Sequence, residues 1–154
     1  HRILRAAETG ALKPRPAAVG LRQLLLDVSR SLGDVMTVDA DDSILNTDVV
    51  LARQVVTALA INALEAAGDG GPVALEGRLD GGDVAVSIRN PGDMPVDVRL
   101  QLFHRGFTTK GPGRGLGLYL ARLLTMRYLH GELTVDDATE GDTVFRLVLP
   151  LDGP

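Results

Sequence analysis

The sequence predicts an α/β fold, a two-layer sandwich in which helices cover one face of a mixed, mostly antiparallel sheet. Residues 72–79 and 83–90 alternate between apolar and polar side chains, as half-buried strands do. Apolar residues recur at helical spacing in 21–32, 49–67 and 116–129. The chain has 154 residues, and a hydrophobic content of 45% is enough for one domain with a real core.

The first half of the chain divides into five segments. Residues 1–18 begin like a helix and then break at Gly10, Pro14 and Pro16, which indicates the end of one helix and a linker. A helix over 21–32 precedes two strands, 35–40 and 43–46. Asp48 is a suitable N-cap for the long helix that follows, and the glycines of 68–71 end it.

The second half is built mainly of hairpins. The strands 72–79 and 83–90 are joined by a short turn, DGG. A loop-rich stretch over 91–114 precedes the helix 116–129, and the segments 132–137 and 142–150 form a second hairpin. We therefore expect a helix end with its linker at 1–18 and one folded domain at 19–154.

Composition excludes several classes of protein. The chain has no Cys, hence no disulfide framework and no thiolate metal site, and its three His lack zinc-ligand spacing. The net charge of −4 argues against bulk nucleic-acid binding. No apolar run approaches the roughly 18 residues that span a bilayer, and the N-terminus does not resemble a signal peptide, so we expect a soluble chain.

The stretch GRGLGLYLARLL, 113–124, sets three glycines against the start of a helix. A helix N-terminus offers unpaired N–H groups and a positive dipole end, and residues without side chains let an anion come close. Gly113, Gly115 and Gly117 would thus admit phosphate. The alternative is a flexible loop with a capping glycine and a tight contact between helix and sheet.

Asn62 lies on the apolar face of the long helix, at nearly the same angle as Leu51 and Val55. It is either a satisfied core amide or a ligand whose oxygen reaches a Mg²⁺ ion on nucleotide phosphates. Glu65, one turn later, could bond a ligand water or act as a base, or could be a solvated side chain. Ala58, one turn earlier, leaves space beside Asn62.

Two further segments carry candidate binding residues. The chain leaves its second long strand at Asn90, Pro91 and Gly92. These residue types could bind a ligand, or they could simply form a turn. The segment LFHRGFTTK, 102–110, ends in a lysine that could face phosphate or could simply be solvated.

Taken in order, four segments resemble the motifs of the ATP-binding catalytic domain of bacterial sensor histidine kinases, a fold shared with gyrase, Hsp90 and MutL. QVVTALAINALEAA resembles the asparagine-bearing helix, IRNPGDMP the first glycine box, LFHRGFTTK the phenylalanine box and GRGLGLYLARLL the second glycine box. The resemblance covers roughly residues 19–150. Residues 2–16 resemble the end of a dimerisation helix and its linker.

The resemblance implies a Bergerat ATP-binding fold, the cofactors ATP and Mg²⁺, and transfer of the γ-phosphate to a histidine on a dimerisation domain. Asn62 would hold Mg²⁺, and Glu65 and Lys110 would act in catalysis. Asn90 stands where the family usually has the aspartate that accepts from the adenine amine, and its oxygen can still accept. The residues expected at the nucleotide are Asn62, Asn90, Gly92, Thr108, Thr109, Gly113, Arg114, Gly115, Leu116 and Gly117.

The same resemblance implies the wider context of the domain. Its partners would be ATP, its own dimerisation and phosphoacceptor domain and a response regulator, in a homodimeric full-length protein without nucleic acid. We expect a cytoplasmic domain, whether or not the full-length protein is anchored in a membrane. Ala58 stands at a position where relatives often have a polar residue. A degenerate module, which binds nucleotide and regulates a partner without transferring phosphate, therefore remains an alternative. A hydrolytic ATPase is disfavoured because no water-activating acid stands at position 58.

Overall fold

The computed structural model describes residues 2–69, 71–107, 117–136 and 141–153. Its elements, in chain order, are α1 (Arg2–Thr9), β1 (Ala17–Gly20), α2 (Leu21–Ser31), β2 (Met36–Ala40), β3 (Ile44–Thr47), α3 (Val49–Ala67), β4 (Val73–Asp80), β5 (Asp83–Pro91), α4 (Val96–Gln101), α5 (Gly117–Leu123), a π-helical turn η1 (Leu124–Tyr128), β6 (Glu132–Asp136) and β7 (Asp142–Pro150).

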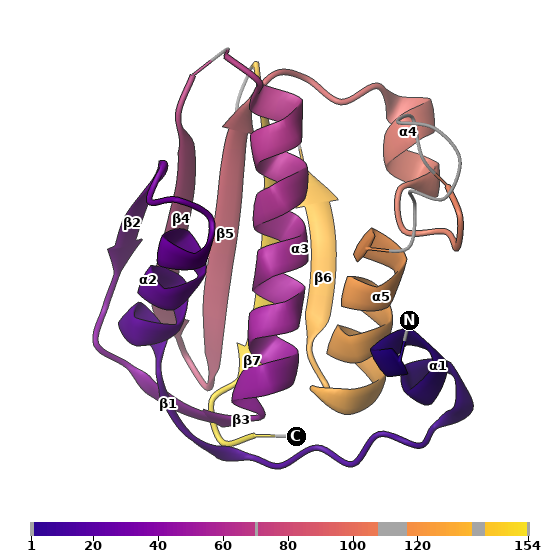
Figure 1. The fold of residues 1–154 in the computed structure, drawn as a ribbon. Helices are drawn as coiled ribbons and strands as arrows, with labels where there is room; N and C mark the ends of the chain where they lie inside the picture. Colours follow the sequence, from indigo (N-terminus) through magenta and orange to yellow (C-terminus); the bar gives the residue numbers. More distant parts are fainter. Residues whose placement is uncertain (1, 70, 108–116, 137–140, 154) are drawn as a thin grey trace.

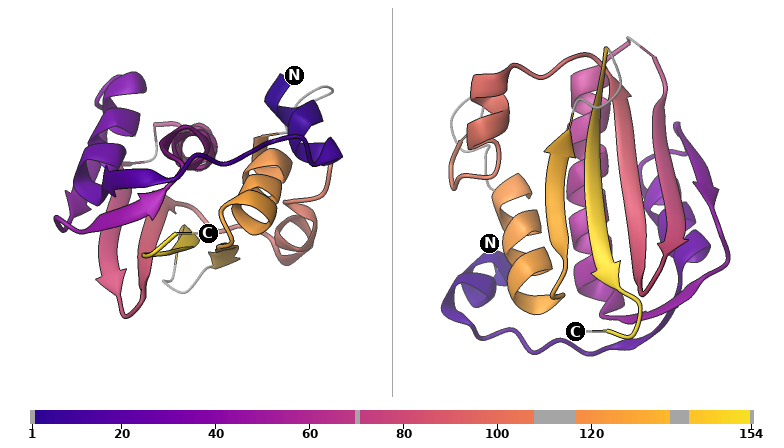
Figure 2. Two further views of the ribbon diagram at one scale, coloured as in Figure 1. Left: turned by 90° about the horizontal axis from the view of Figure 1, so that it is seen from below. Right: turned by 180° about the vertical axis from the view of Figure 1, so that it is seen from behind.

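One mixed sheet of five strands forms the first layer, in the order β2-β4-β5-β7-β6. β2 pairs with β4 in parallel and all other neighbours are antiparallel, while β1 and β3 form a separate two-stranded sheet. The helices α2, α3 and α5 lie on one side of the large sheet (Figure 1), and seen from behind its strands stand in front of α3 (Figure 2). The predicted two-layer sandwich is confirmed.

Helix α3 carries the centre of the core. Leu51, Val55 and Leu59, spaced by one turn, are all buried against the sheet. The Asp48 carboxylate accepts a hydrogen bond from the backbone N–H of Leu51 at 3.0 Å, so Asp48 is the predicted N-cap. Gly68, with φ 51°, ends the helix.

The expectation that no apolar run is long enough to span a bilayer was wrong on length and composition. Val49–Ala67 has 19 residues and a mean hydropathy of 1.4, enough by those measures alone to cross a membrane. Its apolar face packs on the sheet of this domain, as the core helix of a soluble protein does, and a core helix meets the same length and composition criteria as a spanning one.

Three elements differ from the sequence prediction. β1 begins in the predicted linker and crosses its end at residue 18, and it pairs with β3 through Ala17 and Thr47 and their neighbours. α4 is a short helix within the predicted loop 91–114. The helix predicted over 116–129 is described from Gly117 and passes into a π-helical turn at Leu124.

Candidate functional site

The structure brings several predicted site segments to one end of the molecule. The C-terminal half of α3, the end of β5 and helix α4 lie toward the upper end in Figure 1, and α5 begins below α4, near mid-height. Asn62, Glu65, Asn90, Gly92 and Gly117 are described. The other predicted residues lie outside the described ranges: Thr108, Thr109, Lys110, Gly113, Arg114, Gly115 and Leu116.

Asn62 is half-buried on α3 between the buried residues Leu59 and Ala63. Within the described part of the chain its side-chain amide makes no hydrogen bond, so Asn62 is not a core amide satisfied by these residues. A partly buried amide without a partner is available to a ligand. Glu65 is exposed one turn further along, and Ala58 is half-buried one turn before.

Asn90 is the most informative side chain of the site. Asn90 is only 2% exposed, and its side-chain Nδ2 donates a hydrogen bond to the carbonyl of Pro91 at 2.9 Å. Its Oδ1 is buried and accepts no hydrogen bond from the described residues. Leaving a buried acceptor unpaired costs free energy, and native proteins rarely do so without a reason. The buried Oδ1 of Asn90 is therefore an available acceptor, the group that an exocyclic amine requires.

Thr143 completes the surroundings of Asn90 and was missed by the sequence reasoning. It lies directly opposite Asn90 in the pairing of β5 with β7 and is 3% exposed. Its Oγ1 donates to the carbonyl of Gly92 at 2.7 Å, and the Gly92 N–H donates to Gly141 at 2.6 Å. These bonds fix the turn that follows Asn90, where Gly92 has φ 106°. Only the strand pairing, not local sequence, identifies Thr143.

Gly117 begins helix α5. A Cβ at this position would meet no described atom within 4 Å, so no described neighbour demands a glycine there. Glycine weakens a helix relative to alanine, and the explanation through a tight helix contact therefore has no support at Gly117. Space free of described atoms at the start of a helix fits the approach of an anion.

The described residues do not form a metal site made of protein side chains alone. No group of three or more His, Cys, Asp or Glu that could hold an ion occurs among these residues. An amide oxygen such as that of Asn62 is a ligand that Mg²⁺ accepts together with phosphate oxygens. The donor set thus fits a metal that arrives with a nucleotide.

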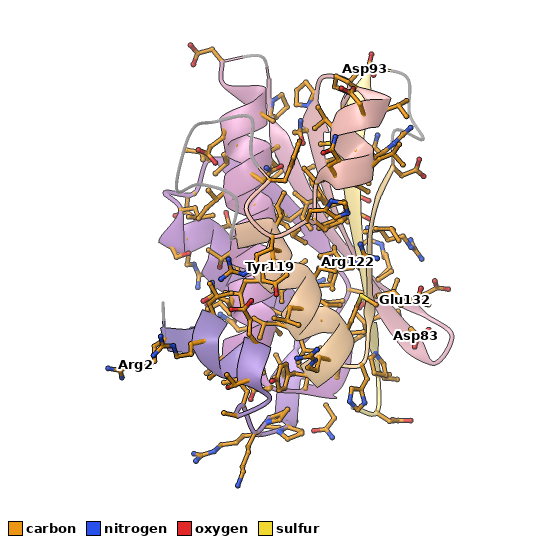
Figure 3. All side chains as sticks on the ribbon, turned by 90° about the vertical axis from the view of Figure 1, so that its right-hand side faces the viewer. Arg2, Asp83, Asp93, Tyr119, Arg122 and Glu132 are labelled. Atoms are coloured by element: carbon orange, nitrogen blue, oxygen red, sulfur yellow. The ribbon has the colours of Figure 1, made fainter. Side chains whose placement is uncertain are left out.

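A groove of about 420 Å³ lies elsewhere, along α5 and η1. The guanidinium of Arg122 stacks over the ring of Phe103 at 5.2 Å. Figure 3 looks onto this side of the molecule and labels Tyr119 and Arg122 on α5. None of the predicted nucleotide residues lines the groove, which is formed by Phe103, Tyr119, Arg122, Leu123, Met126 and Arg127.

Comparison with known proteins identifies the fold and the family. The model of the family "Histidine kinase-, DNA gyrase B-, and HSP90-like ATPase" matches residues 47–153. The signal transduction histidine-protein kinase AtoS of Escherichia coli (strain K12) is 30% identical over 120 residues, which are 76% of this chain and 19% of AtoS. The chain thus spans about a fifth of that relative.

Solved structures give the same result. The catalytic domain of the histidine kinase ThkA in a nucleotide-free form superposes with a TM-score of 0.82 at 25% identity, covering 90% of this chain and 97% of that domain. Full-length ShkA in complex with AMPPNP has the same fold, with a TM-score of 0.82 at 22% identity over 99% of this chain and 34% of ShkA. The chain therefore belongs to the family of histidine kinase-, DNA gyrase B- and HSP90-like ATPases, as a catalytic domain of the sensor histidine kinase type.

Proposed function

We propose that this domain binds Mg-ATP and donates its γ-phosphoryl group to a histidine on a dimerisation domain of the same kinase. The observation that carries the proposal is the buried, unpaired Oδ1 of Asn90 at the end of β5. In a domain of this family an acceptor at that place suits the adenine amine, and a bound nucleotide would remove the cost of leaving it unpaired. The AMPPNP in the ShkA complex supports a nucleotide ligand for this fold.

The base and phosphates of the nucleotide have separate partners in this proposal. Asn90 accepts from the adenine amine, and Thr143 and Gly92 hold the turn beside it. Residues at and before the start of α5 meet the phosphates through backbone N–H groups. These residues are Thr108, Thr109, Gly113, Arg114, Gly115, Leu116 and Gly117.

Asn62 is the proposed protein ligand of Mg²⁺. The ion, when bound, neutralises charge on the phosphate oxygens. Asn62 contributes one neutral oxygen from α3 and so positions the phosphate end of the nucleotide relative to the core helix. Glu65 orients water or accepts a proton near this ligand, and Lys110 adds positive charge at the phosphates.

The transfer itself demands positioning more than covalent chemistry. A nitrogen of the acceptor histidine forms a bond to the γ-phosphorus, and the bond from that phosphorus to the bridging β–γ oxygen breaks. ADP leaves, and the imidazole releases one proton, which Glu65 or water accepts. The domain holds the nucleotide so that this in-line approach is possible, and positioning of this kind supplies most of the rate. The histidine belongs to another domain.

Calorimetry with ATP and GTP tests the nucleotide assignment. Asn90→Leu removes the buried acceptor, and we expect it to reduce the preference for ATP over GTP by about 1–3 kcal/mol, the cost of one lost buried hydrogen bond. The matched control is Asn46→Leu, because Asn46 is an exposed asparagine on β3. Full ATP preference in Asn90→Leu would place the adenine contact elsewhere.

A degenerate module that binds nucleotide without transferring phosphate is the second candidate, and Ala58 favours it. This half-buried alanine supplies no polar group one turn before Asn62. Magnesium-dependent ATP binding without transfer to a supplied phosphoacceptor domain would select this candidate, and Ala58→Asn should then restore transfer.

The same proposal implies a linker, a dimeric state and a partner for the full-length protein. Residues 1–18 form the link from a dimerisation helix to the catalytic domain at 19–154, and the full-length protein is a homodimer that passes phosphate to a response regulator. The domain works in the cytoplasm. A test is the mass in solution of a protein that includes the preceding helix, which should be that of a dimer.

A further inference from the structure

The side-chain amide of Asn90 lies in one definite orientation. Its Nδ2 donates to the carbonyl of Pro91, and because a carbonyl can only accept, the end that faces Pro91 has to be the amide nitrogen. The other end, Oδ1, is buried and is the end left for a ligand. The two ends of an amide are alike in shape and opposite in hydrogen-bonding character, so the orientation decides which base the side chain can recognise.

Turning the amide of Asn90 by 180° would exchange a buried acceptor for a buried donor. In the observed orientation Oδ1 accepts from an exocyclic amine, which adenine carries. In the turned orientation Nδ2 would donate to a carbonyl oxygen, which guanine carries at the corresponding place. The turned amide would also set Oδ1 against the Pro91 carbonyl, two acceptors at the distance of a hydrogen bond. The Pro91 carbonyl therefore favours the orientation that recognises adenine.

The Pro91 carbonyl is itself held in place from β7. The N–H of Gly92 belongs to the same planar peptide and donates to the carbonyl of Gly141 at 2.6 Å. The carbonyl and the N–H of a trans peptide point in opposite directions, so this bond directs the Pro91 carbonyl away from Gly141. Thr143 donates to the next carbonyl along the chain, that of Gly92, at 2.7 Å. Two hydrogen bonds thus restrain the turn against which the Asn90 amide rests.

The ring of Pro91 restrains the same turn from the other side of β5. Gly71 lies just before β4, which pairs with β5, and both strands reach the upper end of the molecule there (Figure 1). A Cβ at Gly71 would stand 3.1 Å from Cγ of Pro91, so the ring packs closely on the glycine backbone. Gly71 has φ 141°, a conformation that suits glycine. The ring also limits the φ of Pro91.

We propose that Pro91 is a positioning residue for base selectivity, which holds the Asn90 amide so that Oδ1, and not Nδ2, meets the base. This inference rests on the proposed nucleotide function and adds a residue that acts through Asn90. A carboxylate has two equal ends and needs no such support. An asparagine needs it, because a turned amide would favour a different base.

The test compares the affinities for ATP and GTP in variants of the whole chain by calorimetry. In Pro91→Ala the ring contact with Gly71 and the limit on φ are lost, so the Asn90 amide can turn and offer Nδ2 to guanine. We expect the ratio of ATP affinity to GTP affinity to fall about tenfold, mainly through tighter GTP binding, as for the exchange of one buried hydrogen bond. A merely structural role of Pro91 would weaken both nucleotides alike. Pro95→Ala is the matched control, because Pro95 is exposed before α4.

Two further comparisons test the contact and the amide separately. Gly71→Ala should lower the same ratio, because its Cβ would displace the Pro91 ring, and it serves as well if Pro91→Ala does not fold. Gly81→Ala is the control for backbone strain, since Gly81 also has a positive φ, 62°, but its Cβ would meet no described atom within 4 Å. In Asn90→Asp combined with Pro91→Ala the tighter GTP binding should not occur, because a carboxylate has no N–H to donate.

The outcomes separate this inference from the proposed function. A wild type that prefers ATP, with an unchanged ratio in Pro91→Ala and Gly71→Ala, would overturn the role of Pro91 and leave the nucleotide function standing. Tighter GTP binding that persists in Asn90→Asp with Pro91→Ala would also overturn it, because the amide would not be the source. Absence of ATP binding by the wild type would overturn both.

Discussion

At the scale of single residues, Asn62 and Asn90 differ in how much of their role the sequence could predict. The angular position of Asn62 on its helix was readable from the sequence, and the structure places it half-buried without a hydrogen bond among the described residues. The burial of Asn90 and the engagement of its nitrogen by Pro91 depend on the pairing of β5 with β7. Such long-range pairing leaves no local signal in the sequence.

The metal role of Asn62 gives the first prediction. Asn62→Ala removes one oxygen ligand, so ATP affinity in the presence of Mg²⁺ should fall by about tenfold, which corresponds to about 1.4 kcal/mol. Affinity without Mg²⁺ should change little, and the melting temperature should be kept because Asn62 is only half-buried. Calorimetry with and without Mg²⁺ measures both values, and equal loss in the two conditions would argue against metal binding by Asn62.

Gly117 gives a prediction in which stability and binding move in opposite directions. A Cβ at Gly117 meets no described atom within 4 Å, so Gly117→Ala should stabilise α5 by about 0.5–1 kcal/mol. The added methyl group should hinder the phosphates and weaken ATP binding. Thermal melting and calorimetry measure the two effects.

The contrasting variant is Gly131→Ala. A Cβ at Gly131 would meet the carbonyl of Val148 and the side chain of Leu149 at clashing distances, so this variant should lose stability. Unchanged ATP affinity in Gly117→Ala would mean that the glycine is not needed for the ligand.

At the scale of elements, periodicity predicted the long segments and failed on the short ones. α3 and the strands β4 and β5 follow from helical spacing and alternation over many residues. β1 has only four residues, and its pairing with β3 holds it in the sheet. The two prolines before β1 indicated a linker, so nothing in the sequence indicated a strand there. The docking of α1 joins Glu8 to Arg105 across 97 positions of the chain, and no local pattern marks such a contact.

The docked helix makes a prediction about pH. The pKa of Glu8 is lowered by Arg105 and Tyr119, so the contribution of its carboxylate to stability is present above the pKa of the unfolded chain, about 4.3 for a glutamate. It is lost as the pH falls through the lower folded value. The difference in melting temperature between wild type and Glu8→Gln should therefore be largest near pH 6–7 and should vanish toward pH 3.

The comparison with Glu8→Gln isolates one carboxylate from all the others that titrate in acid. Arg105 and Tyr119 face Glu8, and neither changes its charge between pH 3 and 7, because the pKa of each is raised from a value already far above this range. Arg127 donates to the backbone carbonyl of Glu8. A difference that stays constant over this range would mean that the charge of Glu8 does not contribute.

At the scale of the whole molecule, the sequence predicted the architecture and the structure added the relation between its parts. Helices on one face of a mixed sheet followed from the order and periodicity of the elements. Strand order and the end of the molecule at which the candidate site gathers follow from long-range packing of apolar faces. The family match over 47–153 covers the elements from α3 to β7.

The chain as it stands is expected to bind ATP without labelling itself. Of its histidines, His104 and His130 are described, and both are exposed and lie in non-helical segments; His130 has φ 55°. A phosphoacceptor must present its nitrogen in line with the γ-phosphate, and neither position is built for that. Incubation with γ-labelled ATP should leave the isolated chain unlabelled.

Phosphate transfer to a supplied dimerisation domain tests the central claim most directly. The dimerisation domain that the proposed function requires, with its acceptor histidine intact, is added in trans together with Mg-ATP labelled at the γ-phosphate. We predict acid-labile label on that histidine, lost when the histidine is replaced and strongly reduced with Asn62→Ala. Acid-labile label on the isolated chain, or no label on the natural partner domain despite measured ATP binding, would contradict the account.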